Sequence, residues 1–268
     1  TNVSLGLSGF YFTRNYYEWD EDRAGGRVAL GYQFTPDLSG SIAFRGAEIT
    51  VTDPIRNDLD ELNEVLGNNT LLGVRSQLAY DTRDSSFLAT EGYYIELGFE
   101  QVFGTFEYPR ADVEVRRYFT LHERPDGSGR HVLALNGRAG WTGEDTPIYE
   151  HFFIGGFTTI RGFDFRGASP SRLGVFVGGE FQLLASAEYM FPITADDMIR
   201  GVVFVDSGTV EPKIGDWTDN YRVAPGFGLR ITVPAMGPAP IALDLAVPLM
   251  REGTDEIRNF NFSVGWTR

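Results

Sequence analysis

Most of this chain alternates apolar and polar side chains with a period of two residues. In one segment, for example, Ile95, Leu97 and Phe99 alternate with Glu96, Gly98 and Glu100. Successive side chains of a β-strand point to opposite faces, so the pattern predicts strands. We expect twelve of them, at Asn2–Tyr17, Gly25–Phe34, Leu38–Val51, Leu71–Asp81, Gly92–Gln101, Arg110–Leu121, Val132–Thr142, Phe181–Phe191, Ile199–Asp206, Arg222–Val233, Ile241–Val247 and Asn259–Trp266.

The length of these segments and the difference between their faces favour a membrane protein. Most are longer than the usual globular strand of about 5–6 residues and approach the ~9–11 that a tilted strand needs to cross a bilayer. One face is apolar, with aromatics near the ends, whereas the other is polar and rich in glycine, which suits lipid outside and a polar lumen inside. Backbone groups in a membrane must all be paired, so the strands have to close. The prediction is an all-β fold, a transmembrane antiparallel β-barrel; a soluble sandwich or lipocalin-like protein is the alternative.

Composition excludes several other classes. No apolar run in the 268 residues approaches the roughly 18–20 that a membrane-spanning helix needs. Asp and Glu number 37 against 23 Lys and Arg, a net charge of -14, which argues against a nucleic-acid partner. Cysteine is absent, so disulfides and thiolate chemistry are excluded for these residues.

The connections between the strands alternate in length, as outer-membrane barrels require, with short turns facing the periplasm and long loops facing the exterior. The short turns are Thr35–Asp37, Pro192–Asp197 and Pro234–Pro240. The longer, mostly acidic loops are Glu18–Ala24, Asp53–Thr70, Gly143–Gly179 and Ser207–Asn220. Within the second loop, one or two helical turns are expected in Asn57–Leu66, with Leu59, Leu62 and Leu66 on one side.

The longest interval without alternation is Phe152–Ser169, which carries Gly155 and Gly156 and then Ile160-Arg161-Gly162-Phe163. Paired glycines, aromatics and two arginines indicate a structured loop. The motif resembles the signature of the BamA-like outer-membrane assembly family, in which a large extracellular loop folds back into the barrel. Tyr80–Asp84 with Gly92 behind it, and the closing Phe260–Trp266, resemble further parts of that family. The resemblance implies that residues 143–180 form a loop inserted into the lumen.

The number of strands around this loop fits the same resemblance. Five predicted strands follow the loop and seven precede it, and in the family the loop joins the eleventh and twelfth of sixteen strands. The 268 residues would then be a single but incomplete barrel domain, residues 1–268, with four strands and the periplasmic POTRA domains upstream of Thr1. A barrel of twelve strands stays open as an alternative.

The resemblance also implies two lumen partners for the loop arginine, Glu188 and Asp206. Strand parity directs Glu188 into the lumen, but parity alone does not make the two carboxylates neighbours. A desolvated arginine needs such charged partners. In the alternative, Arg161 only caps an exposed turn. We expect Ile160 and Phe163 to pack the tip of the loop against the wall, and the sequence suggests no role for Arg166.

The last predicted strand is the second candidate functional element. Its alternate residues Phe260, Phe262, Val264 and Trp266 are expected to face lipid. This resembles the C-terminal signal by which barrel proteins are handed to the assembly machinery, which binds it by adding a strand to an open edge. The family usually ends on an aromatic residue, whereas this chain ends on Arg268.

Enzymatic functions find little support. His122, His131 and His151 are not spaced as a metal site, and no serine lies in a G-x-S-x-G elbow. Asp81 and Asp84 could form a catalytic carboxylate pair, but a turn with an intervening arginine explains them better. We therefore expect neither enzymatic activity nor a cofactor.

The resemblance implies an outer-membrane protein insertase, which folds and inserts other β-barrel proteins. Its expected partners are nascent outer-membrane proteins as clients, the lipid bilayer, periplasmic chaperones and accessory assembly lipoproteins. The alternatives are a translocation pore of two-partner secretion or of autotransporter assembly, and, in a different class, a passive porin.

Overall fold

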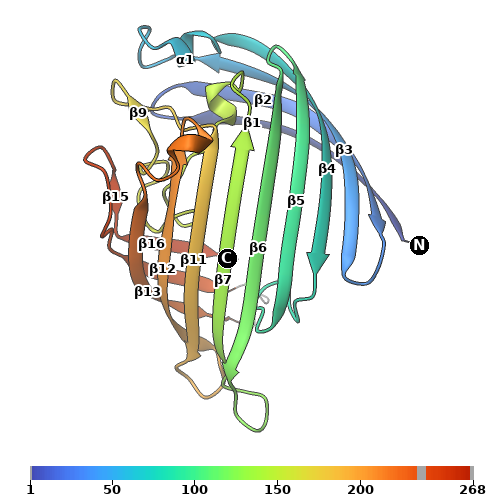
Figure 1. Ribbon diagram of the computed structural model, residues 1–268, viewed down its shortest axis with the longest axis vertical. Helices are drawn as coiled ribbons and strands as arrows, with labels where there is room; N and C mark the ends of the chain where they lie inside the picture. Colours follow the sequence, from blue (N-terminus) through green and yellow to red (C-terminus); the bar gives the residue numbers. More distant parts are fainter. Residues whose placement is uncertain (1, 234–239, 266–268) are drawn as a thin grey trace.

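Twelve antiparallel strands form one curved sheet in the computed structural model, which describes residues 2–233 and 240–265 (Figure 1). Neighbouring strands follow the order of the chain, except that β11 comes directly after β7. The strands are β1 Val3–Asn15, β2 Asp20–Gln33, β3 Leu38–Thr52, β4 Gly67–Asp81, β5 Gly92–Gly104, β6 Tyr108–His122, β7 His131–Thr142, β11 Phe181–Pro192, β12 Ile199–Glu211, β13 Arg222–Ile231, β14 Ile241–Ala246 and β16 Phe260–Val264. All twelve predicted strands are thus confirmed.

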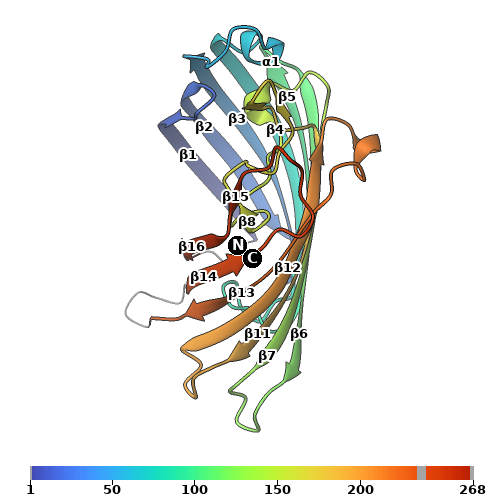
Figure 2. The ribbon, with the colours of Figure 1, turned by 90° about the vertical axis from the view of Figure 1, so that its left-hand side faces the viewer.

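The sheet curls into the wall of a barrel, and in Figure 2 β1 and β16 both lie on the left-hand side of the picture. Among the described residues, β1 pairs only with β2 and β16 pairs only with β14. The ladders shorten towards the C-terminal edge, since β3 and β4 share fourteen residue pairs (Leu38↔Tyr80 to Val51↔Gly67), whereas β14 and β16 share five. Whether the native barrel has twelve or sixteen strands stays a prediction.

Several strands extend further into the predicted loops than expected. β2 begins at Asp20 rather than Gly25, and β12 continues to Glu211, so the predicted loops Glu18–Ala24 and Ser207–Asn220 are shorter. The extra residues include buried acidic side chains, Glu21 and Glu211, both 1% exposed. Their carboxylates bind Arg23 and Asn220, respectively. The strand prediction relied on alternating apolar residues. It therefore missed these strand ends, where polar side chains find their hydrogen-bond partners inside the lumen.

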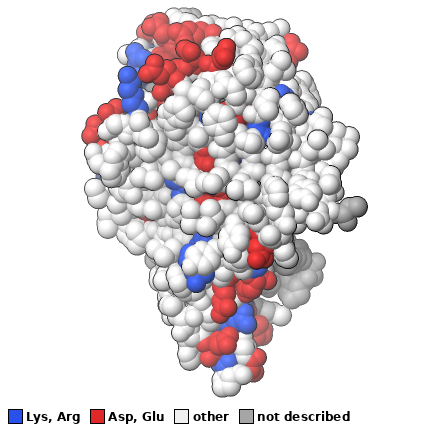
Figure 3. Space-filling view, turned by 45° about the vertical axis from the view of Figure 1, so that its right-hand side comes forward, with Lys and Arg blue, Asp and Glu red and all other residues white. Residues whose placement is uncertain are grey.

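The alternating faces of the strands are confirmed as an apolar outside and a mixed inside. On β5, Leu97 and Phe99 are exposed on the outer face, whereas Glu100 is buried on the inner face. Figure 3 shows charged side chains gathered at the upper and lower ends of the molecule, with a largely uncharged band between them. Such a band is the surface that a bilayer requires.

The loop between β3 and β4 contains the predicted helical turn as α1, Asp60–Asn63 (Figure 1). Leu59 and Leu62 are buried, as expected, but Leu66 is 40% exposed, contrary to the expectation. The helix ends too early to bring Leu66 to the same face, since β4 starts at Gly67. Within residues 2–233 and 240–265, no helix is both long and apolar enough to cross a membrane.

The loop between β7 and β11 lies against the inner face of the sheet (Figure 2). It contains a 3₁₀ turn at Ile148–Glu150 and three short strands, β8 Gly162–Phe163, β9 Ser171–Arg172 and β10 Val175–Phe176. Ile160 and Phe163 are both fully buried, and they pack with Leu184, Val210 and Ala224 of the wall. Burial of each such side chain contributes about 1.5–3 kcal/mol relative to exposure.

The turn between β4 and β5 also packs inward, where Leu88 contacts the cluster of Met190, Val202, Phe204 and Ala246. Asp81 and Asp84 shape this turn. Arg83 donates to both carboxylate oxygens of Asp81, at 2.9 and 2.8 Å, and Asp84 accepts from the backbone and hydroxyl of Thr90 at 2.8 and 2.6 Å. Both carboxylates are therefore occupied by structural contacts, as a turn requires.

Candidate functional site

A sharp reversal of the chain at Gly162 directs the side chain of Arg161 into the lumen wall. Gly162 has a φ of +96°, a conformation that side-chain-bearing residues rarely adopt. The neighbouring Ile160 and Phe163 are buried in the apolar cluster of the loop, and Arg161 itself is only 1% exposed. The buried neighbours Ile160 and Phe163 thus hold the backbone of Arg161 in place, in addition to the polar contacts of its guanidinium.

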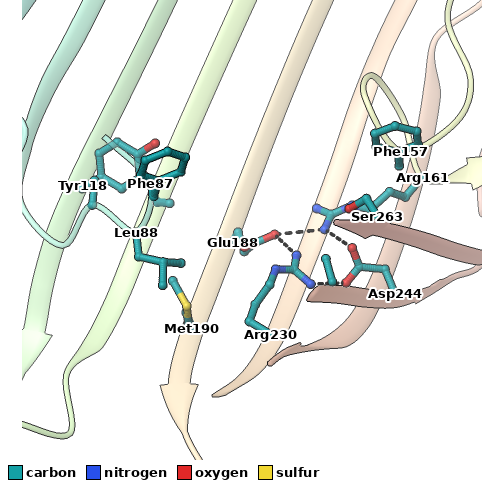
Figure 4. A pocket seen from close by; sticks show the side chains of 13 residues that line it. Phe87, Leu88, Tyr118, Phe157, Arg161, Glu188, Met190, Arg230, Asp244 and Ser263 are labelled. Carbon is teal, nitrogen blue, oxygen red and sulfur yellow. Dashed lines mark hydrogen bonds and ion pairs between the residues drawn. The ribbon is translucent and has the colours of Figure 1, made fainter. Parts of the chain in front are cut away.

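Arg161 binds three carboxylates that come from three different strands, and Figure 4 shows two of them, Glu188 and Asp244. Its Nε and Nη2 donate to the two carboxylate oxygens of Asp206 at 2.7 and 2.9 Å, and its backbone N–H donates to the same residue at 3.1 Å. Its Nη1 donates to Glu188 at 3.0 Å and to Asp244 at 3.1 Å. The loop is therefore joined to β11, β12 and β14 through a single side chain.

The register between β11 and β12 explains why the two predicted acids are neighbours. Ser186 pairs with Asp206 and Glu188 pairs with Phe204, so both carboxylates lie on the inner face. The guanidinium lies over the Phe204 ring, 3.2 Å from its centroid, and Ser186 donates to Asp206 at 2.7 Å. The register between β11 and β12 thus makes Glu188 and Asp206 neighbours, which strand parity alone did not determine.

Two members of the cluster, Asp244 and Arg230, escaped the sequence analysis. Arg230 donates to Asp244 at 2.6 Å and to Glu188 at 3.1 Å, which closes a network of two cations and three carboxylates. The signal for Asp244 was present in the sequence, because it is the polar member of the alternating β14. No comparable signal marked Arg230, whose role depends on the strand order.

The charge of Arg161 is fixed by this arrangement. Burial alone would lower the pKa of Arg161, but Asp206, Glu188 and Asp244 outweigh it, so the pKa is raised. Removing one partner of such a buried network leaves the others uncompensated in a medium of low polarity. Chemically, the cluster is an anchor, since every one of its charged groups is occupied by another.

The same loop has a second anchor of opposite sign. The buried Glu150 is bound by Arg23 at 2.7 Å, by Arg45 at 3.5 Å and, more distantly, by Arg110 at 3.8 Å. These arginines come from β2, β3 and β6, which lie on a different part of the wall from the strands that hold Arg161. The loop thus presents a carboxylate to a basic wall and a guanidinium to an acidic wall.

The family of the protein follows from a match along almost its whole length. Residues 1–267 match the Omp85 superfamily domain. The chain belongs to the Omp85 superfamily. It is accordingly an outer-membrane β-barrel protein, in agreement with the all-β fold and the uncharged band of Figure 3.

Several Omp85 relatives resemble the chain over most of its length. It is 27% identical over 216 residues to the outer membrane protein assembly factor BamA of Nitratidesulfovibrio vulgaris, covering 76% of this chain and 26% of that protein. It is also 27% identical to a SAM50-like protein of Drosophila melanogaster, covering 72% of this chain and 44% of that protein. The chain therefore spans less than half the length of these curated relatives.

Two solved structures share the fold of this Omp85 barrel. BamA of Haemophilus ducreyi lacking POTRA domains 1–3 superimposes with a TM-score of 0.82 at 19% identity, over 97% of this chain and 58% of that one. CdiB of Acinetobacter baumannii superimposes with a TM-score of 0.66 at 15% identity, over 98% and 47% of the two chains. At these identities the likeness concerns the fold alone.

The last strand of the Omp85 barrel has the predicted orientation where it is described. Phe260, Phe262 and Val264 are between 51% and 56% exposed on the outer face, and Asn261 is buried on the inner face. Trp266, the fourth residue of the predicted signal, lies outside the described residues. The outer row therefore lies on the lipid-facing side of the wall.

Arg166, which had no sequence assignment, is a buried cation held by aromatic rings. Its guanidinium carbon lies 3.9 Å from the ring centroid of Tyr16 and 4.0 Å from that of Phe153. Burial lowers its pKa from the ordinary value. The residue joins the loop to the β1–β2 hairpin, a contact between segments 150 residues apart that no local pattern could indicate.

We expect Glu150→Gln to destabilise the folded barrel by about 2 kcal/mol, because three arginines would lose a shared carboxylate. Arg23 would keep its contact with Glu21, and Arg45 would keep its contact with Glu100. Burial would raise the pKa of Glu150, but the arginines outweigh it and lower the pKa. Its contribution to stability is therefore present above the ordinary carboxyl pKa and is lost as the pH falls through the lowered one. Denaturant unfolding of the purified barrel measures the effect, and Glu144→Gln, an exposed acid in the same loop, is the control.

Proposed function

We propose that this Omp85 barrel is an outer-membrane protein insertase, which helps other β-barrel proteins to fold into the membrane. The curated relatives include a protein named as an outer membrane protein assembly factor, which supports this assignment at the level of the family. The driving force would be the pairing of backbone groups and the burial of lipid-facing side chains in the client, without nucleotide or cofactor. The clients would be nascent outer-membrane proteins.

The observation that carries the proposal is the state of the C-terminal edge. Among the described residues, β16 is held to β14 by five residue pairs, the fewest between neighbouring strands of the large sheet. A last strand that is joined by so few pairs would separate readily, and its backbone donors and acceptors would then let an extended segment add as a new strand. Phe260 and Phe262 beside it would contribute apolar surface to the same contact.

The anchored loop would keep this edge functional by stabilising the rest of the barrel. A wall that opens at one edge needs support elsewhere, and the two charge clusters tie the loop to β2, β3, β6, β11, β12 and β14. In this proposal Arg161 and Glu150 act on the barrel and make no contact with the client.

The experiment is reconstitution of the complete protein into liposomes, followed by addition of a urea-unfolded client barrel. We expect folding of the client, measured as the appearance of its compact band on unheated gels, to be accelerated at least about tenfold over empty liposomes, equivalent to ~1.4 kcal/mol of barrier. Liposomes with an unrelated porin are the control.

Two outcomes of this assay would contradict the insertase proposal. If the client folds at the same rate in both kinds of liposome, the insertase assignment is wrong. Transfer of a soluble secreted partner across the membrane, without insertion of a barrel client, would instead favour a translocation pore. Periplasmic chaperones and accessory lipoproteins remain predicted partners, and their addition to the same assay tests them.

A further inference from the structure

The Arg161–Phe163 segment makes a second set of contacts, through its backbone, with the chain that leads into the last strand. Gly162 and Phe163 form β8, which pairs in antiparallel fashion with β15, Ile257–Arg258. The pairing is extended by two bonds, Asp164 N–H to the Glu256 carbonyl at 2.9 Å and Glu256 N–H to the Gly167 carbonyl at 2.8 Å. β15 ends two residues before Phe260, where β16 begins.

Two glycines of the loop allow this close approach. A Cβ on Gly167 would lie 2.9 Å from the Cβ and 3.0 Å from the carbonyl oxygen of Glu256. A Cβ on Gly162 would meet Pro248 at 3.1 Å and Ala246, the last residue of β14, at 3.3 Å. The loop is therefore packed tightly against both the end of β14 and the start of β15.

These contacts link the loop, β14, β16 and β15 into a closed ring. Arg161 binds Asp244 on β14, β14 pairs with β16, and the segment before β16 pairs with the residues next to Arg161. Two residues before β15 in the chain, Asp255 accepts hydrogen bonds from Arg222 of β13 through both carboxylate oxygens, at 3.1 and 2.9 Å. The chain before β16 is thus fixed at two points, whereas the β14–β16 ladder itself is the shortest between neighbours in the large sheet, five residue pairs among the described strands.

We propose that the loop backbone at Gly162–Gly167 positions the last strand, β16. By pairing with Glu256–Arg258, it fixes the point at which the chain enters β16 and holds β16 in register for pairing with a client strand. This inference rests on the proposed function. It assigns the Gly162–Gly167 segment a role beyond the charge cluster, because the buried side chain of Arg161 fastens the loop to the wall while the backbone beside it fastens the edge strand to the loop.

The test is a pair of matched substitutions in the complete protein. Gly167→Ala places a methyl group against Glu256, whereas Gly253→Ala, in the loop that leads to β15, adds a methyl group where nothing lies within 4 Å. Neither glycine has a positive φ, so the two substitutions test the space available for a methyl group rather than backbone strain. A second disruptive variant, Glu256→Pro, removes the N–H that binds the Gly167 carbonyl and approaches the same contact from the other side.

Amide hydrogen exchange of Phe260–Val264 is the first readout, and it does not depend on insertase activity. Loss of one backbone hydrogen bond changes an opening equilibrium by about fivefold, so we expect exchange at these amides to rise about fivefold in Gly167→Ala and in Glu256→Pro. Gly253→Ala should exchange like the unaltered protein. Unchanged exchange in both disruptive variants would overturn the positioning role.

Insertion of a client barrel is the second readout. We expect its rate to fall about fivefold in the disruptive variants, in step with the lost hydrogen bond, while their own compact band on unheated gels is retained. Faster exchange with unchanged insertion would overturn the proposed link to the client. If the unaltered protein does not insert clients but the exchange difference is present, the proposed function fails and the structural role of the contact stands.

Cross-linking decides whether the contact stays closed during insertion. Asp164 and Glu256 are opposite one another; the side chain of Asp164 is 42% exposed and Glu256 is exposed. The 268 residues contain no cysteine. We expect the pair Asp164→Cys and Glu256→Cys to form a disulfide and to insert clients equally well when oxidised and when reduced. Insertion that is lost on oxidation and restored by a reductant would overturn the proposal, because the contact would then have to open.

Discussion

Replacing Arg161 with Ala is expected to destabilise the barrel by roughly 3–5 kcal/mol, the cost of removing one partner from a buried network of charges. Glu188, Asp206 and Asp244 would then face Arg230 as the one remaining cation of the network, and the fully buried Asp206 would lose a bidentate partner. The temperature at which the compact band on gels is lost, together with the denaturant midpoint in detergent, measures this change. We expect insertion of clients to fall with it.

The matched control is Arg172→Ala in the same loop. The side chain of Arg172 is 60% exposed and pairs with Glu61 at the surface, so its removal should change stability by less than about 0.5 kcal/mol. Equal effects of the two substitutions would mean that loss of positive charge from the loop, rather than loss of the buried contact, explains the result. An Arg161→Ala barrel with unchanged stability and unchanged insertion would refute the anchor.

Gly155→Ala is expected to destabilise the inserted loop by roughly 2–4 kcal/mol, from backbone strain and overpacking together. Gly155 has a φ of +123°, and a Cβ on it would lie 2.1 Å from the carbonyl oxygen of Asp164. That oxygen belongs to the backbone of the loop and cannot move aside without breaking the turn before Gly167. Limited proteolysis of the loop and the denaturant midpoint measure the effect.

The adjacent Gly156→Ala provides the comparison. Gly156 also has a positive φ, +90°, but the nearest atom to a Cβ there is the Cα of Phe165 at 3.7 Å, which is ordinary contact. Only the backbone strain remains, so we expect a cost of about 1 kcal/mol. If the two substitutions are equally costly, the close approach at Gly155 does not matter and the strain alone accounts for the paired glycines.

The alternation of residues was enough to predict the strands and their faces, because each side chain of a strand sees either lipid or lumen. The same rule placed Glu188 and Asn261 inside and Phe260 and Phe262 outside. It was less reliable at the extracellular ends of β2 and β12. There, inward-facing polar residues such as Glu21 are satisfied by distant partners, and a pattern of hydropathy cannot distinguish a satisfied polar residue from a solvated one.

The candidate site was predictable in part. The arginine of the loop and two of its carboxylate partners came from the motif and its resemblance to a family, but Asp244 and Arg230 did not. The second anchor, Glu150 with Arg23, Arg45 and Arg110, was missed as a whole. Its members are spread over more than 120 residues, and nothing local to any of them indicates the others.

The sequence by itself determined the strands, their inner and outer faces, and the position of the irregular loop, because these properties depend on neighbouring residues and on the period of the backbone. Only the tertiary structure decided which charges meet and how the loop backbone pairs with the chain before β16. Those contacts depend on strand order and register, which bring together residues such as Arg161 and Asp244 that are 83 positions apart. Sequence patterns describe one strand at a time, whereas register is a property of pairs of strands.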